Sequence, residues 1–167
     1  SSYDPIYKVN PPLRTESDVH ALREALADGT IDIVATDHAP HPLEDKECEW
    51  QEAAFGMLGL ETALSIVQMT MVNSGLMSWQ QVAERMSHKP ASIGGYEHQG
   101  QRIEKGSFAN LVVINPTKLW RVDRDLVLSN SSNTPYHGHE LPGVVEHTVF
   151  KGKQTLINGQ ISQGGGK

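Results

Sequence analysis

Apolar and polar positions change rhythm several times along the chain, and the first change predicts a helix between two strands. Apolar residues at helical spacing follow the T-x-x-D capping pattern of Thr15 and Asp18, which predicts a helix over residues 16–28. IDIVAT at 31–36 is β-branched and apolar apart from one aspartate, which is typical of a buried parallel strand. IYKVN at 6–10 looks like the end of an earlier strand, closed by two prolines. This order of elements indicates an α/β fold.

The next region predicts helices after an irregular loop. Residues 41–55 are polar, charged and without a period, and a loop of this length in a compact domain is often functional. Apolar residues at helical spacing then predict a helix over about 60–73. Ser78 and Gln81 have the spacing of a capping box, which predicts a second helix, and a short third helix is expected near 90–94.

The pattern changes again after Gly95, where short β-type runs replace helical spacing. FANLVVI, VVEHTVF and TLING are separated by Gly, Pro and Asn turns, with tight turns expected at 101–107 and 151–153. We therefore divide the chain into an α/β part, residues 1–95, and a β-rich part with a flexible glycine-rich tail, residues 96–167.

Composition narrows the classes of function. The chain has 167 residues, 38% of them hydrophobic, which is enough for a core. A net charge of −6 without a long Lys/Arg block argues against nucleic-acid binding and favours a small-molecule partner. No stretch approaches the roughly 20 apolar residues of a membrane-spanning helix. The single cysteine, Cys48, suits a reducing compartment, so we expect a cytoplasmic protein.

The candidate chemistry begins where the apolar run at 31–36 ends, in ATDHAPH at 35–41. Side chains at the carboxyl ends of parallel strands point into the catalytic mouth of α/β folds, so Asp37 is placed to bind a divalent metal or to carry protons. The alternative is a polar turn in which Asp37 accepts backbone N–H groups, with His38 and His41 half exposed. The residues alone leave the two readings evenly balanced.

Four further motifs change that balance. VNPPLR at 9–14, FGMLGLET at 55–62, KGSFANLVVINP at 105–116 and NTPYHGHELPGVVEHTVFKGK at 133–153 occur with ATDHAPH in one order. Together they resemble the C-terminal part of the dihydroorotase family, the metal-dependent bacterial type of the amidohydrolase superfamily. The resemblance implies the C-terminal part of a (β/α)8 TIM-type barrel plus a share of a small β-sandwich. Because a barrel needs about 250 residues, we expect this chain to be a fragment.

Site residues follow from the resemblance position by position. Asp37 corresponds to the aspartate of the eighth barrel strand, a ligand of a binuclear zinc centre that also acts as general base and acid. His41 and Asn10 correspond to substrate contacts, and main-chain groups of Phe55 and Gly56 to a loop over the substrate ring. The family's other metal ligands and its carboxylate-binding arginine have no counterpart here, and Arg14 does not take that place.

The implied activity is the reversible hydrolysis of dihydroorotate to carbamoyl-aspartate in pyrimidine synthesis, with the fragment alone inactive because one ligand cannot hold zinc. Two alternatives remain. One is a hydantoinase or allantoinase, a cyclic amidase with the same barrel. The other is a non-catalytic scaffold subunit of aspartate transcarbamoylase. We expect a homo-oligomer, with association with aspartate transcarbamoylase under the scaffold alternative.

Other polar residues receive structural assignments. His38 follows Asp37 directly and on an extended backbone would point away from the metal, so we expect it to be structural. Lys46 is expected to be a solvated charge, and Trp50 to hold the 41–55 loop in place. The H-G-H pair His137 and His139 is expected at the surface or at an interface rather than around a metal.

Overall fold

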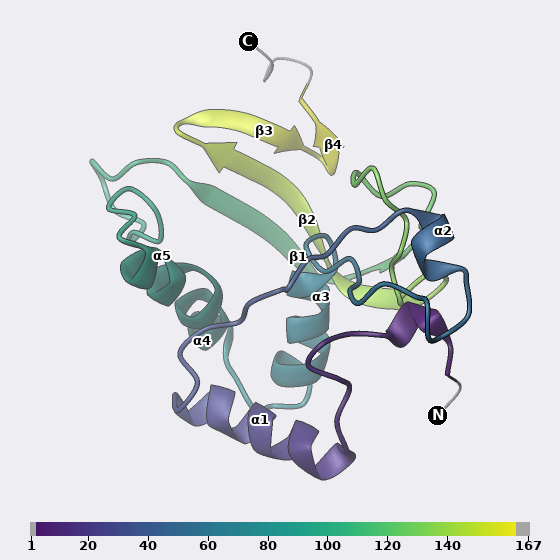
Figure 1. The fold of residues 1–167 in the computed structure, drawn as a ribbon. Helices are drawn as coiled ribbons and strands as arrows, with labels where there is room; N and C mark the ends of the chain where they lie inside the picture. The colour runs from purple at the N-terminus through teal and green to yellow at the C-terminus, as the bar shows by residue number, and fades with distance from the viewer. Residues whose placement is uncertain (1–2, 163–167) are drawn as a thin grey trace.

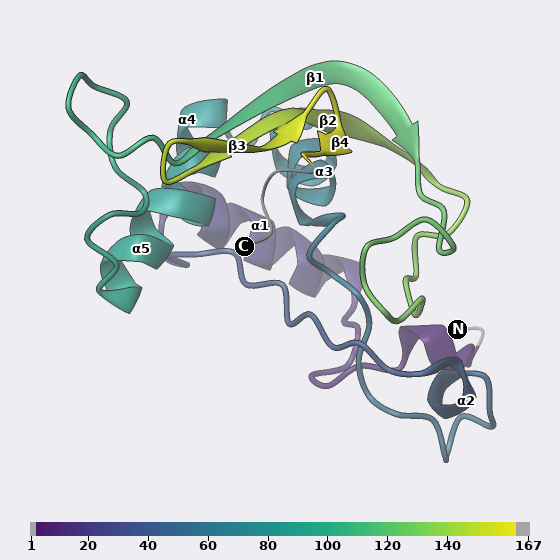
Figure 2. The same cartoon turned by 90° about the horizontal axis from the view of Figure 1, so that it is seen from above.

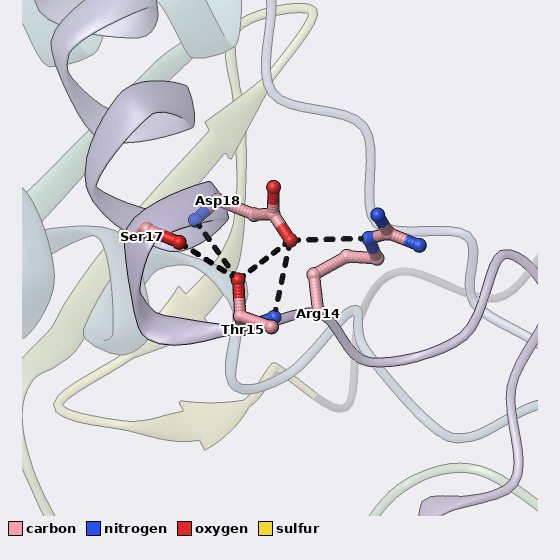
Figure 3. Close-up of polar contacts among 4 residues, drawn as sticks. All are labelled: Arg14, Thr15, Ser17 and Asp18. Atoms are coloured by element: carbon pink, nitrogen blue, oxygen red, sulfur yellow. Dashed lines mark hydrogen bonds and ion pairs between the residues drawn. The ribbon is translucent and has the colours of Figure 1, made fainter.

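The computed structural model describes residues 3–162, and Figure 1 shows a curved sheet above a group of helices. The chain starts with a 3₁₀ helix, η1 (Pro5–Tyr7), followed by α1 (Glu16–Asp28). The bounds of α1 are those that the sequence predicts. Its capping box is formed in full, because Thr15 Oγ1 accepts the N–H of Asp18 while Asp18 Oδ2 accepts the N–H of Thr15 (Figure 3).

The two strands expected on either side of α1 are not formed, so that part of the prediction is wrong. Residues 31–36 have no regular secondary structure, and residues 5–7 are the helix η1. A strand exists only when a neighbour completes its ladder of hydrogen bonds. In the described chain the N–H of Val34 donates instead to the carbonyl of Arg85, 3.1 Å away, and the only pairing nearby is an isolated parallel bridge between His38 and Met57.

The helices expected in the middle of the chain are present but are shorter and interrupted. After a single turn, α2 (Leu43–Lys46), the structure has α3 (Ala63–Val67), α4 (Trp79–Ala83) and α5 (Lys89–Gly94). π-helical segments continue α3 and α4, namely η2 (Gln68–Val72) and η3 (Glu84–His88). The expected capping box of Ser78 and Gln81 is formed at the start of α4.

A small core joins these helices. Its buried members are Val67, Met71, Met77 and Val82, and Leu26 of α1 is among the residues packed against them. The guanidinium Nε of Arg85 also donates to the carbonyl of Leu26, which fixes the end of α1 to η3. None of the residues of α1 is fully buried, and Leu22 remains 53% exposed.

The β-rich part forms one antiparallel sheet with the order β1-β2-β3-β4. Its strands are β1 (Leu111–Arg121), β2 (Glu140–Phe150), β3 (Lys153–Ile157) and β4 (Gln160–Ile161). The turn predicted at 151–153 joins β2 to β3, and its Lys151 and Gly152 both have positive φ, as a two-residue hairpin turn requires. The end of the expected glycine-rich tail, residues 163–167, lies outside the described residues.

The helix α3 lies beneath β1 and β2 in Figures 1 and 2. Side chains of α3 and η2 attach the helical group to the sheet. Trp120 of β1 donates its indole N–H to Ser65 Oγ at 2.9 Å, and Ser65 donates to the carbonyl of Gly143 in β2 at 3.1 Å. Gln68 Nε2 donates to the carbonyl of Pro116 at 2.7 Å. These contacts hold the two parts of the chain together. Within residues 3–162, no helix is long and apolar enough to cross a membrane.

Candidate functional site

Asp37 has an unusual backbone and an available carboxylate. Its φ is 46°, in the left-handed region that L-residues with a side chain seldom adopt, and its side chain is exposed. None of the hydrogen bonds or ion pairs found among residues 3–162 involves its carboxylate. The polar-turn alternative, in which Asp37 accepts backbone N–H groups, is therefore not what the structure adopts. Backbone strain of this kind is concentrated at functional sites.

His38 holds the segment that follows the site. Its Nδ1 accepts the N–H groups of Gly59 at 3.1 Å and of Leu60 at 3.3 Å. The N–H of Ala39 donates to the carbonyl of Met57, next to the bridge between His38 and Met57. These bonds agree with the structural part expected for His38.

Three of the predicted substrate-contact residues come together here. His41 Nε2 lies 3.0 Å from the carbonyl oxygen of Phe55, and because a carbonyl can only accept, the Nε2 nitrogen carries the proton. Gly56 is buried with φ at 138°, and a Cβ there would lie 2.5 Å from Ala39 Cβ and 3.0 Å from His41 Nε2. Only glycine allows this close approach. The 35–41 and 55–62 motifs thus meet at one place.

Asn10 lies on the segment that contacts Gly56. It is exposed, and its peptide bond to Pro11 is cis. Two residues earlier, the carbonyl of Lys8 accepts the N–H of Gly56 at 2.9 Å. The structure therefore places the chain around Asn10 beside the Phe55–Gly56 segment, although no side-chain hydrogen bond of Asn10 is formed among residues 3–162.

Two buried lysines support the loop between these motifs, and for Lys46 the expectation of a solvated charge is wrong. Lys46 is 2% exposed and donates to the carbonyls of Lys8 at 3.3 Å and Ala54 at 2.9 Å. Burial, and then the charge of Lys8, lowers the pKa of Lys46. Lys8 itself is 7% exposed and donates to the carbonyls of Trp50 and Gln51.

Aromatic rings complete this support. The Lys8 ammonium lies 4.6 Å from the ring centre of Phe55 and 5.9 Å from that of Trp50, within the range of cation–π attraction. Trp50 also packs edge-on against Tyr3. Trp50 thus holds the loop, as expected. A cavity of about 400 Å³ opens beside Lys8, Trp50 and Phe55, but neither Asp37 nor His41 lines it.

Asn133 is the residue of this region that the sequence did not single out. Its side chain is completely buried and contacts both motifs, donating to the carbonyls of Ala39 at 3.0 Å and Gly56 at 3.4 Å and accepting the N–H of His41 at 3.2 Å. It comes from the loop between β1 and β2, which lies beside α2 and the N-terminal segment in Figures 1 and 2. A lone asparagine in a polar loop gives no signal that separates it from an ordinary turn residue.

The side chains of the described residues do not by themselves form a metal site. Within residues 3–162 there is no group of three or more His, Cys, Asp or Glu side chains that could hold a metal ion. His38 Nδ1 and His41 Nε2 are taken by main-chain groups. His137 Nδ1 accepts the N–H of Arg124, and Arg14 pairs with Asp18. On their own, the described residues therefore do not fit a zinc site, and Asp37 is the one predicted ligand.

Comparison with known proteins gives this geometry a context. Residues 9–155 match the amidohydrolase family. The chain belongs to this family. It is 61% identical over 161 residues to the dihydroorotase of Streptomyces coelicolor and 50% identical to that of Mycobacterium tuberculosis. Each match covers 96% of this chain, but the chain spans only 38% and 37% of the length of those relatives.

Solved structures of other amidohydrolases share the fold. The chain is similar to the L-hydantoinase of Arthrobacter aurescens, with a TM-score of 0.88 and 33% identity, covering 96% of this chain and 36% of that one. It is also similar to a D-hydantoinase from Thermus sp., with a TM-score of 0.85 and 26% identity, covering 95% of this chain and 35% of that one. The mixed helix and strand arrangement is thus the one found in hydantoinases.

Proposed function

We propose that this chain is the C-terminal part of a dihydroorotase, which interconverts dihydroorotate and carbamoyl-aspartate by closing and opening a cyclic amide. The observation that carries the proposal is the contact between His41 and Phe55, which joins two predicted substrate-binding segments 14 residues apart. The 61% identity to a dihydroorotase supports it. The fold assignment that goes with it is the last part of a (β/α)8 barrel, residues 1–95, followed by a share of a β-sandwich, residues 96–167.

In this proposal each residue has a defined chemical task. The exposed carboxylate of Asp37 takes a proton from the attacking water and passes it to the leaving nitrogen. Asn10 contacts the substrate as a hydrogen-bond donor. His41 contacts it as an acceptor through Nδ1, because its Nε2–H already donates to the carbonyl of Phe55. Because the N–H of Gly56 already donates to Lys8, the main-chain donor left for the substrate in that segment is the N–H of Phe55.

The zinc expected from the resemblance belongs to the whole protein. A zinc site needs at least three protein ligands, and the described residues contribute Asp37 alone. We therefore assign no catalytic step of this chain to a metal, and propose that Asp37 joins ligands supplied from outside it. A cytoplasmic location and a homo-oligomeric state are parts of the same proposal, as is association with aspartate transcarbamoylase under the scaffold alternative.

The test uses the full-length protein that carries this chain. We expect it to hydrolyse dihydroorotate and to cyclise carbamoyl-aspartate, and Asp37→Asn or His41→Asn to lower the rate by roughly 100-fold or more. His137→Asn is the matched control, because His137 is exposed and outside the site. Turnover of hydantoin with none of dihydroorotate would favour the hydantoinase alternative, which the structural likeness supports. Absence of both activities, with co-purification of aspartate transcarbamoylase, would favour the scaffold.

A further inference from the structure

We propose that Asn133 is a positioning residue, which holds His41 and the Phe55–Gly56 segment in the geometry of the substrate site. The inference rests on the proposed function, because it concerns the same site. It adds a residue from the β-rich part of the chain to a site whose other members all lie within the first 56 residues.

The hydrogen bonds of Asn133 use its whole side-chain amide. The two N–H groups of Nδ2 face the carbonyls of Ala39 and Gly56, and Oδ1 faces the N–H of His41. Carbonyls only accept and a main-chain N–H only donates, so the neighbours fix which end of the amide is nitrogen. The main-chain carbonyl of Asn133 accepts one more bond, from Leu58 at 3.1 Å.

Asparagine is the side chain that suits this environment. Aspartate would keep the acceptor for His41 but would place a charged oxygen against the carbonyls of Ala39 and Gly56. Leucine has a similar shape but would leave all three main-chain groups without this partner, in a place that is 0% exposed at Asn133. The residue type is therefore set by the two segments that it joins.

The loop that carries Asn133 is itself fixed at two points. At its base, the N–H of Val122 donates to His139 and the N–H of Gly138 donates to Val122. Further along, Glu61 Oε1 accepts the N–H groups of Leu128 and Ser129. Asn133 thus reaches residues 77 to 94 positions earlier in the sequence from a defined support.

The consequence concerns His41 most directly. Its main chain is held by Asn133 and its ring by the carbonyl of Phe55, while Asn133 also bonds to the next residue, Gly56. Without Asn133, both the backbone of His41 and the partner of its ring can move. Because Asn133 is fully buried, it acts through these neighbours and does not touch the substrate. A displacement of about 1 Å in such a site can lower the rate about 100-fold.

The test compares Asn133→Asp and Asn133→Ser with Asn130→Asp in the full-length protein that carries this chain. Asn130 lies in the same loop and is exposed, so it is a matched amide control. We expect a 10-fold to 100-fold loss of kcat/KM per folded molecule for both Asn133 variants. For Asn133→Ser, whose shorter side chain does not reach the N–H of His41, we also expect faster hydrogen exchange at the amide of His41. In the His41→Asn background, Asn133→Asp should add less than 3-fold to the loss. The Asn130 variant should behave as the parent.

Unchanged kcat/KM per folded molecule would overturn the proposal, since a merely structural residue lowers only the folded fraction. It would also be overturned if the losses of His41→Asn and Asn133→Asp multiply in the double variant, because the two residues would then act independently. If Asn133→Asp does not fold, the milder Asn133→Ser variant gives the same comparison. The hydrogen-exchange measurement tests the role of Asn133 separately from the proposed function, because it needs no substrate. A parent protein that is inactive on dihydroorotate refutes the proposed function, while unchanged exchange at the amide of His41 in Asn133→Ser refutes the role of Asn133.

Discussion

The Nδ1 atom of His38 lies 3.1 Å from the main-chain nitrogen of Gly59 and accepts its hydrogen bond. The same atom accepts the N–H of Leu60 at 3.3 Å. An unprotonated Nδ1 leaves the proton of the neutral imidazole on Nε2. The residue after Asp37 therefore fixes the end of the segment at 57–60, so His38 shapes the site although it is not one of its proposed chemical groups.

Replacing His38 should show how much its Nδ1 acceptor contributes to stability. His38→Ala leaves two main-chain N–H groups without their partner, and we expect a loss of about 1–3 kcal/mol in the free energy of unfolding. His38→Asn places an oxygen near the position of Nδ1, so it should recover most of that loss. Urea unfolding of the three proteins gives the comparison. Equal losses for alanine and asparagine would show that ring packing, and not the hydrogen bonds, is what matters.

The extent to which the sequence predicted the fold depends on how local each signal was. The bounds of α1 were predicted correctly because the capping box of Thr15 and Asp18 and the left-handed Gly29 that ends the helix all lie within or next to the helix. The strand at 31–36 was predicted wrongly because a strand also needs a neighbour, which the described chain does not place there. A β-branched run indicates only what the segment could do if it were paired.

In the site too, features that depend on residues distant in the sequence could not be predicted. His41, Phe55 and Gly56 were predicted from motifs, and the structure brings them together. The burial of Lys46 depends on carbonyls up to 38 residues away, so it could not be predicted from a charged loop. Asn133 lies within one of the motifs that carry the resemblance, but an amide side chain is not a nucleophile, an acid or a base that would mark a site in the sequence. Its part follows only from the three main-chain groups around it.

Gly143 gives a test of the contact between the sheet and η2. Its φ is 85°, and an added Cβ would overlap Oε1 of Gln68. Gln68 is buried, and its Nε2 is held by the carbonyl of Pro116. Gly143→Ala should therefore cost about 1–3 kcal/mol for overpacking beyond the cost of its backbone conformation. Thermal and urea unfolding measure the loss.

Gly152→Ala is the matched control for Gly143. Gly152 has φ at 78°, and a Cβ there would meet nothing within 4 Å. It should show only the conformational cost of about 1–2 kcal/mol. Combining Gly143→Ala with Gln68→Ala should remove part of the excess loss. If the two alanine variants are equally stable, the overlap with Gln68 is not what requires glycine at 143.

Gly56→Ala should damage the site as well as the fold. The new methyl group would press on Ala39 and on the ring of His41 at 3.0 Å, moving the ring away from the carbonyl of Phe55. We expect kcat/KM for dihydroorotate to fall by about 100-fold in the full-length protein. Gly106→Ala, at a positive φ with no neighbour within 4 Å, is the control. A normal KM and kcat for Gly56→Ala would refute the arrangement of His41 against Gly56.

Lys46 should give the protein a pH dependence in the alkaline range. Burial and the charge of Lys8 lower its pKa in the folded state below the ordinary value of 10.5. Between the two pKa values the unfolded chain binds more protons, so the free energy of unfolding rises with pH. We expect the stability of the parent relative to Lys46→Met to increase as the pH rises toward 10.5 and to be constant at neutral pH. A difference that stays constant over the whole range would contradict the lowered pKa.

The capping box of α1 gives a local prediction. Thr15→Ala removes the oxygen that accepts the N–H of Asp18, and we expect it to lower the free energy of unfolding by about 1 kcal/mol, the usual cost of losing such a cap. Thr15→Ser keeps the hydroxyl and should stay close to the parent in urea unfolding. A loss as large for serine as for alanine would mean that the threonine methyl group, rather than the cap, stabilises the helix.

Asp18 should make the same helix sensitive to acid. Hydrogen bonds from Thr15, assisted by Arg14, lower its pKa below the ordinary value of 3.8 (Figure 3). A carboxylate whose pKa is lower in the folded state stabilises it at pH above 3.8, and this contribution disappears as the pH falls through the folded pKa. The stability difference between the parent and Asp18→Asn should therefore be constant near neutrality and shrink below pH 3.8. Thr15→Ala removes the largest cause of the lowered pKa, so in that background the loss below pH 3.8 should be smaller and should end at a higher pH. A loss of unchanged size and range would contradict the assignment.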